Sequence, residues 1–372
     1  MKIAVLLLSA FAVCVIAAAL VDMVPAMRTW LGRIGIGRLS EQEARQKIRA
    51  VALRWLHKTP SVPVSDQTRF TLPERLRGTY RSAHIQAWQQ AALLLGAEQS
   101  GAVQEVRVFH RTVLMPDGRW KQPPQSVDAA LLAYALLRTA NDVEQIRPAM
   151  DAMYAFLRDS VSGGTIPYTS KAAGVRFVDT VGMVCPFLYL YGKTYDCAEA
   201  QTLCMAQLVE YAQKGLHPAL YLPVHAFRRG NGAPLGIYGW GRGCGWYALT
   251  LAEMTRCGAD VQMFAVPFAE ALLSVQQKNG AFSRQLLAEG GTESSATAML
   301  GHFLFVQSAA SHSETFRQSA ARAFSAVVAV TQRNGMVDMA QGDTKGVGFY
   351  SSRLSPLPAA QGFALLLSEE LP

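Results

Sequence analysis

The lengths of the connections between predicted helices constrain this sequence more than any other feature. Hydrophobic periodicity predicts about twelve helices between residues 40 and 370, and the first opens with Ser40 and Glu43 at capping-box spacing. Every second connection is mostly two to four residues long. The others are long and rich in Gly, Pro and aromatic residues, and they cover residues 58–80, 114–124, 160–177, 215–242, 279–291 and 334–357.

Tight helical pairs whose long connections all lie at one end are typical of a closed ring of helical hairpins. We therefore expect an all-α fold, a six-hairpin (α/α)6 barrel formed by one domain at residues 40–372. A stack of helical repeats would also alternate helices, but the sequence has no fixed repeat period. No strand longer than "VRFV" at residues 175–178 is expected. The end with the long loops is the natural place for a binding site.

The first 26 residues form a separate segment. Ile3 to Val21 is apolar and uncharged, and its length suits a membrane-spanning helix better than a short signal core. We predict an uncleaved signal or membrane-anchor segment over residues 1–26. Arg28, Arg33 and Arg38 follow it, and the positive-inside tendency would place the body in the cytoplasm. We favour an exported body, anchored to the membrane with its catalytic domain periplasmic or otherwise extracytoplasmic.

Charge and cysteine content exclude some classes of protein. The net charge is +8 with a pI near 9.2, but the basic residues are scattered, so no nucleic-acid partner is indicated. Dispersed positive charge suits a polyanionic substrate or an acidic membrane surface. The six cysteines contain no CxxC pair, and we expect free thiols.

Four polar residues share one position in the predicted ring. Asp128, Asp179, Arg242 and Glu293 each stand where a long loop enters a helix. Taken singly, an acid at such a position is usually a helix cap. Together the four would face one cavity. Two acids at the rim of an apolar core can be held in different protonation states, which suits general acid and base catalysis on a sugar.

The stretch "YGWGRGCGWYAL" at residues 238–249 points to the ligand. Its dense glycines suggest that the backbone approaches something closely. Trp240 and Trp246 offer stacking faces for a pyranose ring, although core packing explains them equally well. Arg242 has room to present its guanidinium to a carboxylate, so we expect an acidic sugar. His225 on the preceding loop is the histidine that best fits the site, with His217 as its competitor.

The sequence lacks the motifs that would indicate other chemistries. The sequence contains no HExxH, GxSxG or P-loop, and the glycines near residue 241 do not match GxGxxG after a strand. We therefore expect no metal ion or nucleotide.

At these residues the chain resembles glycoside hydrolase family 105, the unsaturated rhamnogalacturonyl hydrolases, and more distantly the unsaturated glucuronyl hydrolases of family 88. The resemblance rests on "FVDTVGMVCPFL", "WGRGCGW", "TESSATAML" and the tail "LPAAQGFALLLSEEL", and it spans most of the chain after the leader. The family fold is the six-hairpin α/α barrel. By resemblance, Asp179 is the catalytic acid and base, and Asp128 is the acid that supports it.

The resemblance implies a hydrolase that removes a 4,5-unsaturated uronic acid from the non-reducing end of oligosaccharides. Hydration of the enol-ether double bond drives the cleavage, without a cofactor. The expected substrate-binding residues are Arg242, Trp240, Trp246, His225 and Glu293.

Three features depart from the family pattern: Cys244, the loop around His225 and the membrane leader. Two alternatives therefore stay open. One is a catalytically silent barrel that binds acidic polysaccharide at the membrane. The other is a different α/α-barrel sugar enzyme, such as an epimerase or an ordinary glycosidase.

Overall fold

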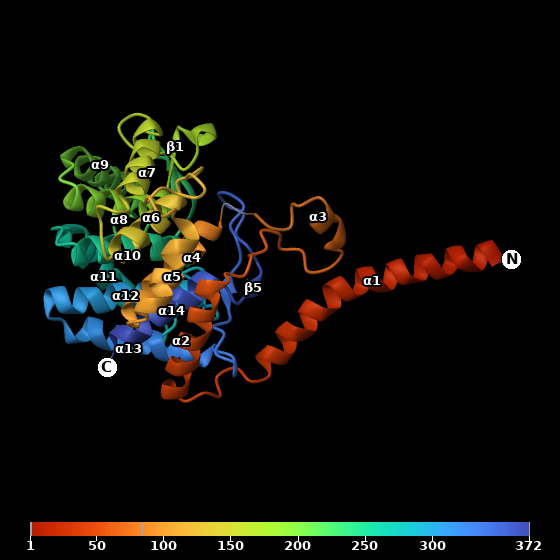
Figure 1. Cartoon of the computed structure of the whole chain (residues 1–372). Coiled ribbons are helices and arrows are strands. Elements are labelled where there is room, and N and C mark those ends of the chain that lie inside the picture. Colours follow the sequence, from red (N-terminus) through yellow and green to blue (C-terminus); the bar gives the residue numbers. More distant parts are fainter. Residues whose placement is uncertain (1, 83–84, 372) are drawn as a thin grey trace.

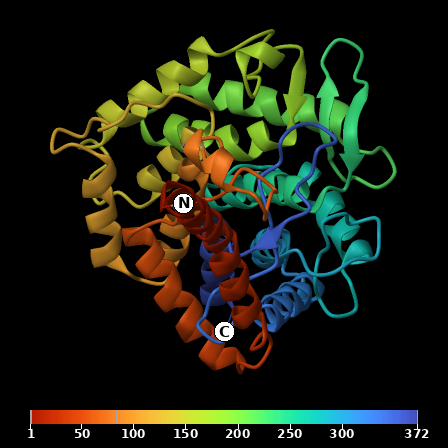
Figure 2. The same ribbon diagram turned by 90° about the vertical axis from the view of Figure 1, so that its right-hand side faces the viewer.

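Two concentric layers of helices form the body of the protein (Figures 1 and 2). The computed structural model describes residues 2–82 and 85–371. The inner ring consists of α4(Gln86–Gln99), α6(Ala129–Arg138), α8(Val178–Thr194), α10(Gly241–Arg256), α12(Ser294–Ser311) and α14(Pro358–Glu370). The outer layer consists of α2(Glu41–His57), α5(Val103–Val113), α7(Arg147–Asp159), α9(Ala198–Gly215), α11(Gln262–Val275) and α13(Glu314–Ala329). Each inner helix packs on the next, and α14 returns to α4, so the ring closes and the predicted (α/α)6 barrel is confirmed.

Burial explains which helices lie inside. Inner helices are apolar on all sides; in α10 every residue from Gly241 to Met254 is buried. Outer helices are amphipathic, and α5 buries only Val106 and Phe109. A helix that is apolar all round must be covered on every side, whereas an amphipathic helix covers it and faces water. The predicted capping box of Ser40 and Glu43 starts α2.

The remaining elements lie outside the barrel layers. They are α1(Lys2–Arg33), α3(Leu72–Leu76), the 3-10 turn η1(Ser170–Ala172), and the strands β1(Val175–Phe177), β2(Val224–Arg228), β3(Pro234–Tyr238), β4(Ala340–Gln341) and β5(Leu354–Ser355). Strands β1, β2 and β3 form an antiparallel sheet in that order, and β4 pairs with β5.

The expectation that no strand exceeds "VRFV" was wrong, because β2 and β3 each have five residues. They form a hairpin inside the long segment 215–242. Pro223, Pro234 and several glycines interrupt the alternation there, so the sequence pattern resembles a loop.

The two ends of the barrel differ. The inner helices begin at one end, the mouth, which carries the long loops. They end at the other, the base, where short turns lead into the outer helices. In Figure 2 the ring is seen end-on with α1 and α3 over the mouth.

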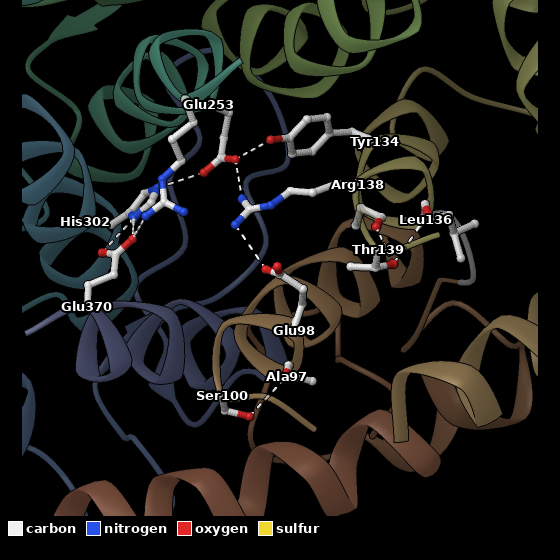
Figure 3. A network of polar contacts seen from close by, with 12 residues as sticks. Ala97, Glu98, Ser100, Tyr134, Leu136, Arg138, Thr139, Glu253, His302 and Glu370 are labelled. Carbon is white, nitrogen blue, oxygen red and sulfur yellow. Dashed lines mark hydrogen bonds and ion pairs between the residues drawn. The ribbon is translucent and has the colours of Figure 1, made fainter. Parts of the chain in front are cut away.

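An ionic network fills the base of the barrel (Figure 3). Glu253 of α10 receives hydrogen bonds from Tyr134 and Arg138 of α6, and its other oxygen lies 2.8 Å from Nε2 of His302. His302 Nδ1 is 2.9 Å from both carboxylate oxygens of Glu370 at the end of α14. The network therefore links α6, α10 and α14, which are far apart in the sequence. It also includes α12, which lies between α10 and α14 in the ring.

Helix α1 stands apart from the barrel. It is the only helix among the described residues long and apolar enough to cross a membrane, with a mean hydropathy of 2.9 over its most apolar window, and that window has no buried residue. It continues past residue 26 as far as Arg33. It projects from the mouth side of the barrel (Figure 1). The described cysteines are all free thiols, as expected.

Candidate active site

A cavity of about 220 Å³ lies at the mouth of the barrel. Its wall includes Asp179, His225, Arg242, Trp246 and the segment 343–346. A larger groove of about 600 Å³ runs outside the ring along α5 and residues 114–121. That groove lies away from the starts of the inner helices, and its wall contains only one carboxylate, Asp142. The mouth cavity is therefore the candidate active site.

Asp128 lies just behind the cavity wall at the start of α6. Its side chain makes no capping hydrogen bond, so it is not the helix cap that its position alone would suggest. The Tyr168 hydroxyl, which lines the cavity, donates to Asp128 Oδ2 at 3.1 Å. Asp128 Oδ1 is buried without a partner among the described residues. An unpartnered carboxylate oxygen in this setting disfavours the charged form.

Burial raises the pKa of Asp128 to about 7, and the nearby carboxylates of Asp179 and Asp343 add to the rise. The hydrogen bond from Tyr168 only partly opposes it. Asp128 is therefore neutral in mildly acidic solution and ionises near neutral pH.

Asp179 is the second residue of α8, and its side chain faces the cavity. Phe177 stands at the N-cap position of that helix, and no side chain caps it. Asp179 Oδ2 lies 3.5 Å from Nε2 of His225 and has no hydrogen-bond partner in the described part of the chain. The Asp179 side chain is 21% exposed, and a carboxyl that is accessible at a cavity wall can exchange a proton with a bound molecule.

The β2–β3 hairpin holds His225 beside Asp179. His225 Nδ1 lies 3.1 Å from the Tyr350 hydroxyl, whose oxygen accepts a hydrogen bond from the backbone N–H of Ile237. The hydroxyl hydrogen is then free to donate to Nδ1 in the tautomer that carries the ring proton on Nε2, facing Asp179. The competing residue His217 lies outside the cavity wall. Its Nδ1 accepts backbone hydrogen bonds from residues 219 and 220 in a local turn.

The guanidinium of Arg242 lines the cavity but is already engaged. It donates to the carbonyl oxygens of Gln341 and Gly342 and, at 3.3 Å, to Oγ1 of Thr344. Its carbon lies 5.9 Å from the Trp88 ring centre and 5.6 Å from that of Trp240. Arg242 therefore holds the 341–344 segment at the mouth, a role that the sequence did not indicate.

Trp240 and Trp246, the two tryptophans of the stretch at residues 238–249, lie in different places. Trp246 contributes to the cavity wall, whereas Trp240 lies behind it and donates its indole N–H to Gln341 Oε1 at 2.9 Å. The ring of Trp240 packs on His225, with centres 4.6 Å apart. Trp240 thus supports the site instead of lining it.

The glycines of the motif bring protein segments together. A Cβ on Gly241 would lie 2.3 Å from the carbonyl oxygen of Ser283, and one on Gly243 would lie 2.6 Å from the Trp240 ring. The expected close approach of the backbone is therefore an approach to neighbouring protein atoms.

Glu293 is not at the cavity, which corrects the expectation that it contacts substrate. Its fully buried carboxylate caps α12 by accepting from the backbone N–H groups of Ser295 and Ala296. It also accepts from the N–H of Gln341 at 2.8 Å. Of the predicted acids, Glu293 is the one that behaves as a helix cap.

Asp343, a third acid at the cavity, was not predicted from the sequence. Burial raises its pKa, Asp179 adds to the rise, and Arg242 opposes it. Lys345 belongs to the same segment and also lines the cavity. The stretch "QGDTKGVG" at residues 341–348 carries two charged residues among glycines, a signal that could have drawn attention to it. No described group of three or more His, Cys, Asp or Glu side chains could hold a metal ion.

Comparisons with known proteins agree with the barrel fold described above. Solved structures similar to this chain include a possible member of family GH105 from Klebsiella pneumoniae, with a TM-score of 0.72 and 13% identity over 89% of this chain and 93% of that one. The unsaturated glucuronyl hydrolase from Bacillus sp. GL1, responsible for the degradation of glycosaminoglycan, has a TM-score of 0.63 and 16% identity over 88% of this chain and 96% of that one. At these identities the likeness establishes the fold.

Comparison with curated protein sequences gives no match. The model of Glycosyl Hydrolase Family 88 matches residues 123–371, about two thirds of the sequence, and the match includes Asp128, Asp179 and the whole tryptophan motif. The chain belongs to glycosyl hydrolase family 88.

Proposed function

We propose that this glycoside hydrolase releases a 4,5-unsaturated uronic acid from the non-reducing end of an oligosaccharide by hydrating its double bond. One observation carries the proposal. Two acids meet at one mouth: Asp128 is almost fully buried, with its pKa raised to about 7, and Asp179 lines the cavity with a side chain that is 21% exposed. Two carboxyls in unlike environments are what general acid and base catalysis on a sugar requires.

Asp179 performs the proton transfers. It gives its proton to C4 of the double bond, which leaves positive charge at C5, shared with the ring oxygen. Water adds to C5 and gives a proton back to the Asp179 carboxylate, so the acid is restored. The resulting hemiketal opens and expels the aglycone. Atoms and protons balance with water as the only co-reactant.

Asp128 and His225 flank Asp179. The charge of Asp179 helps to raise the pKa of Asp128 to about 7, so the two carboxyls are coupled and a proton stays at the site up to near neutral pH. His225 Nε2, 3.5 Å from Asp179 Oδ2, orients the carboxyl. We place both residues beside the reacting group, with Asp179 as the one that exchanges protons with substrate.

The sugar is recognised by its charge. Arg242 and Lys345 line the cavity and supply positive charge for the uronate carboxylate, whereas the Trp246 ring, 1% exposed, borders the cavity from within the core. Because Arg242 already donates to two carbonyls and Thr344, Lys345 is the freer cation of the two. Its Nζ lies 3.8 Å from Asp66, a contact that is easily exchanged at a half-exposed site.

We further propose that α1 anchors the enzyme in a membrane with the barrel on the extracytoplasmic side. Ile3 to Val21 spans about 28 Å as a helix, close to the thickness of the hydrocarbon layer. In that setting the substrate is an acidic oligosaccharide outside the cytoplasm.

A matched pair of substrates tests the activity. Full-length protein is incubated with an unsaturated oligosaccharide made by a polysaccharide lyase and with its saturated counterpart. Mass spectrometry then follows the released aglycone. We expect release from the unsaturated substrate alone. Equal release from both would identify an ordinary glycosidase, and binding without release would identify a silent barrel.

A further inference from the structure

The helix α1 is fixed to the mouth of the barrel at two points. Near its C-terminal end, Arg33 forms a bidentate ion pair with the buried Asp338, with both contacts at 3.0 Å, and donates to the Leu354 carbonyl at 2.7 Å. Farther along, Asp22 accepts from Oγ1 of Thr71 at 2.5 Å. The two points are 11 residues apart, about 16 Å along the helix, so they set its direction as well as its position.

The second fixed point lies at the expected surface of the membrane. Asp22 directly follows the apolar run that ends at Val21, so the hydrocarbon layer must stop near it. Thr71 is hydrogen-bonded to Asp22 and belongs to the loop of residues 66–77, called here the α3 loop. Any lipid surface that surrounds α1 at Asp22 therefore meets the α3 loop as well.

The α3 loop presents apolar side chains at this level. Phe70 is 85% exposed and Leu76 is 79% exposed, and each is adjacent to an exposed arginine, Arg69 or Arg77. Phe70 also has a φ of 54°, an uncommon conformation for a non-glycine residue. Large exposed apolar groups beside basic groups suit the boundary between acyl chains and anionic headgroups.

We propose that the α3 loop rests in the membrane interface beside α1, so that the mouth of the barrel faces the bilayer. The cavity would then receive saccharide chains held close to the membrane surface. A second mouth loop agrees with this orientation, because Phe349 is 74% exposed four residues after Lys345 of the cavity wall. The inference rests on the membrane anchoring proposed above and is independent of the hydrolysis.

Photo-crosslinking tests the orientation. The residue at position 70 is replaced, in full-length protein, by the photoreactive analogue benzoylphenylalanine, and the protein is inserted into vesicles that contain phosphatidylglycerol. The matched control carries the same analogue at position 263. Met263 is 76% exposed at the start of outer helix α11, at the base of the barrel. After irradiation, mass spectrometry counts the lipid adducts.

We expect lipid adducts at position 70 at a yield at least about tenfold above position 263. Equal yields, in protein that still floats with the vesicles, would overturn the proposal while leaving the anchor in place. Failure to float would overturn both the anchor and the orientation. Neither outcome bears on the hydrolase assay, because no sugar is present.

As a second check, Phe70→Ser and Leu76→Ser are combined and the analogue is placed at position 349. If the α3 loop holds the mouth against the bilayer, lipid adducts at position 349 fall in the double variant relative to the otherwise unchanged protein. An unchanged yield would show that α1 alone sets the orientation and that the loop does not rest in the interface. Thermal unfolding of both proteins verifies that they are folded.

Discussion

At the base of the barrel the Glu253 carboxylate is met by Arg138, Tyr134 and His302, whereas at the mouth the Asp128 carboxylate receives a single hydrogen bond, from Tyr168. Both carboxylates are almost fully buried. Burial would raise the pKa of Glu253, but Arg138 and His302 outweigh it and hold that pKa well below its usual range.

Burial at Asp128 is not offset in this way, and the pKa rises to about 7. Burial alone therefore does not decide whether a buried acid is charged, because the groups that contact the acid also shift its pKa. At the base, Glu253 is fixed as an ion and binds helices together. At the mouth, Asp128 keeps a proton that is exchangeable near neutral pH.

The largest expected effect is on catalysis at the mouth. Asp179→Asn keeps the shape of the side chain but can neither deliver a proton to C4 nor take one from water. We expect turnover to fall by at least about 10²–10⁴-fold, the usual contribution of general acid–base catalysis. Turnover and thermal unfolding are measured on the same preparation.

Because, among the described residues, no side chain caps α8 and Asp179 Oδ2 has no hydrogen-bond partner, the unfolding temperature of Asp179→Asn should change little. Retained activity would show that Asp179 is not the proton donor. A large loss of stability would show that its role is structural.

The next effect is on stability at the base. Glu253→Gln removes the charge that Arg138 and His302 share, and breaking a buried ion pair by removing one member costs about 3–5 kcal/mol. Because the folded pKa of Glu253 is lowered, its stabilisation is fully present above its unfolded pKa, so denaturant unfolding is measured at pH 7.

Glu98→Gln is the matched control, since Glu98 pairs with the same Arg138 at 3.1 Å but is 36% exposed. It should cost less than about 1 kcal/mol. Similar losses for the two variants would contradict the view that burial makes Glu253 the essential member.

Asp128→Asn should do the opposite of Glu253→Gln and stabilise the protein at high pH. The folded pKa of Asp128 is about 7 against an unfolded value of 3.8, so the stability that its neutral form provides is complete below 3.8 and is lost as pH rises through 7. The variant should therefore match the natural protein at pH 4 and exceed it at pH 8 by about 1–4 kcal/mol. Unfolding at both pH values measures the difference.

The same variant should be slower and should show a shifted pH profile. Asp128 changes charge near pH 7 beside Asp179, and an amide cannot titrate, so the limb of the turnover profile near that pH should move in the variant. An unmoved limb would show that the two acids do not interact.

The smallest effect is expected at Arg242. Lysine keeps the charge but cannot donate to the carbonyls of Gln341 and Gly342 together, so Arg242→Lys should loosen the 341–344 segment. We expect KM to rise by about tenfold or less, which corresponds to one lost charge-assisted hydrogen bond. A loss confined to charged substrates would assign Arg242 to the uronate carboxylate, and an equal loss for uncharged analogues would assign it to the loop.

The barrel and its acids were predictable because their signals are local. Alternating loop lengths identified the hairpins, and position at a helix start identified Asp128 and Asp179. The engagement of Arg242 was not predictable, because its partners lie about 100 residues away, at the end of the two-residue strand β4 and in the loop that follows it. The base network was missed for the same reason, since Tyr134 and Glu253 are 119 residues apart and only the closed ring brings them together.

The central claim is that the acids of the mouth act on the double bond itself. The most direct test follows the ultraviolet absorbance of the 4,5-double bond and the release of aglycone in parallel, with full-length protein and a lyase-generated unsaturated oligosaccharide. If hydration drives cleavage, the absorbance disappears at least as fast as the aglycone appears. Release of aglycone while the absorbance persists would mean that the unsaturated sugar leaves intact, and it would contradict the proposed hydration.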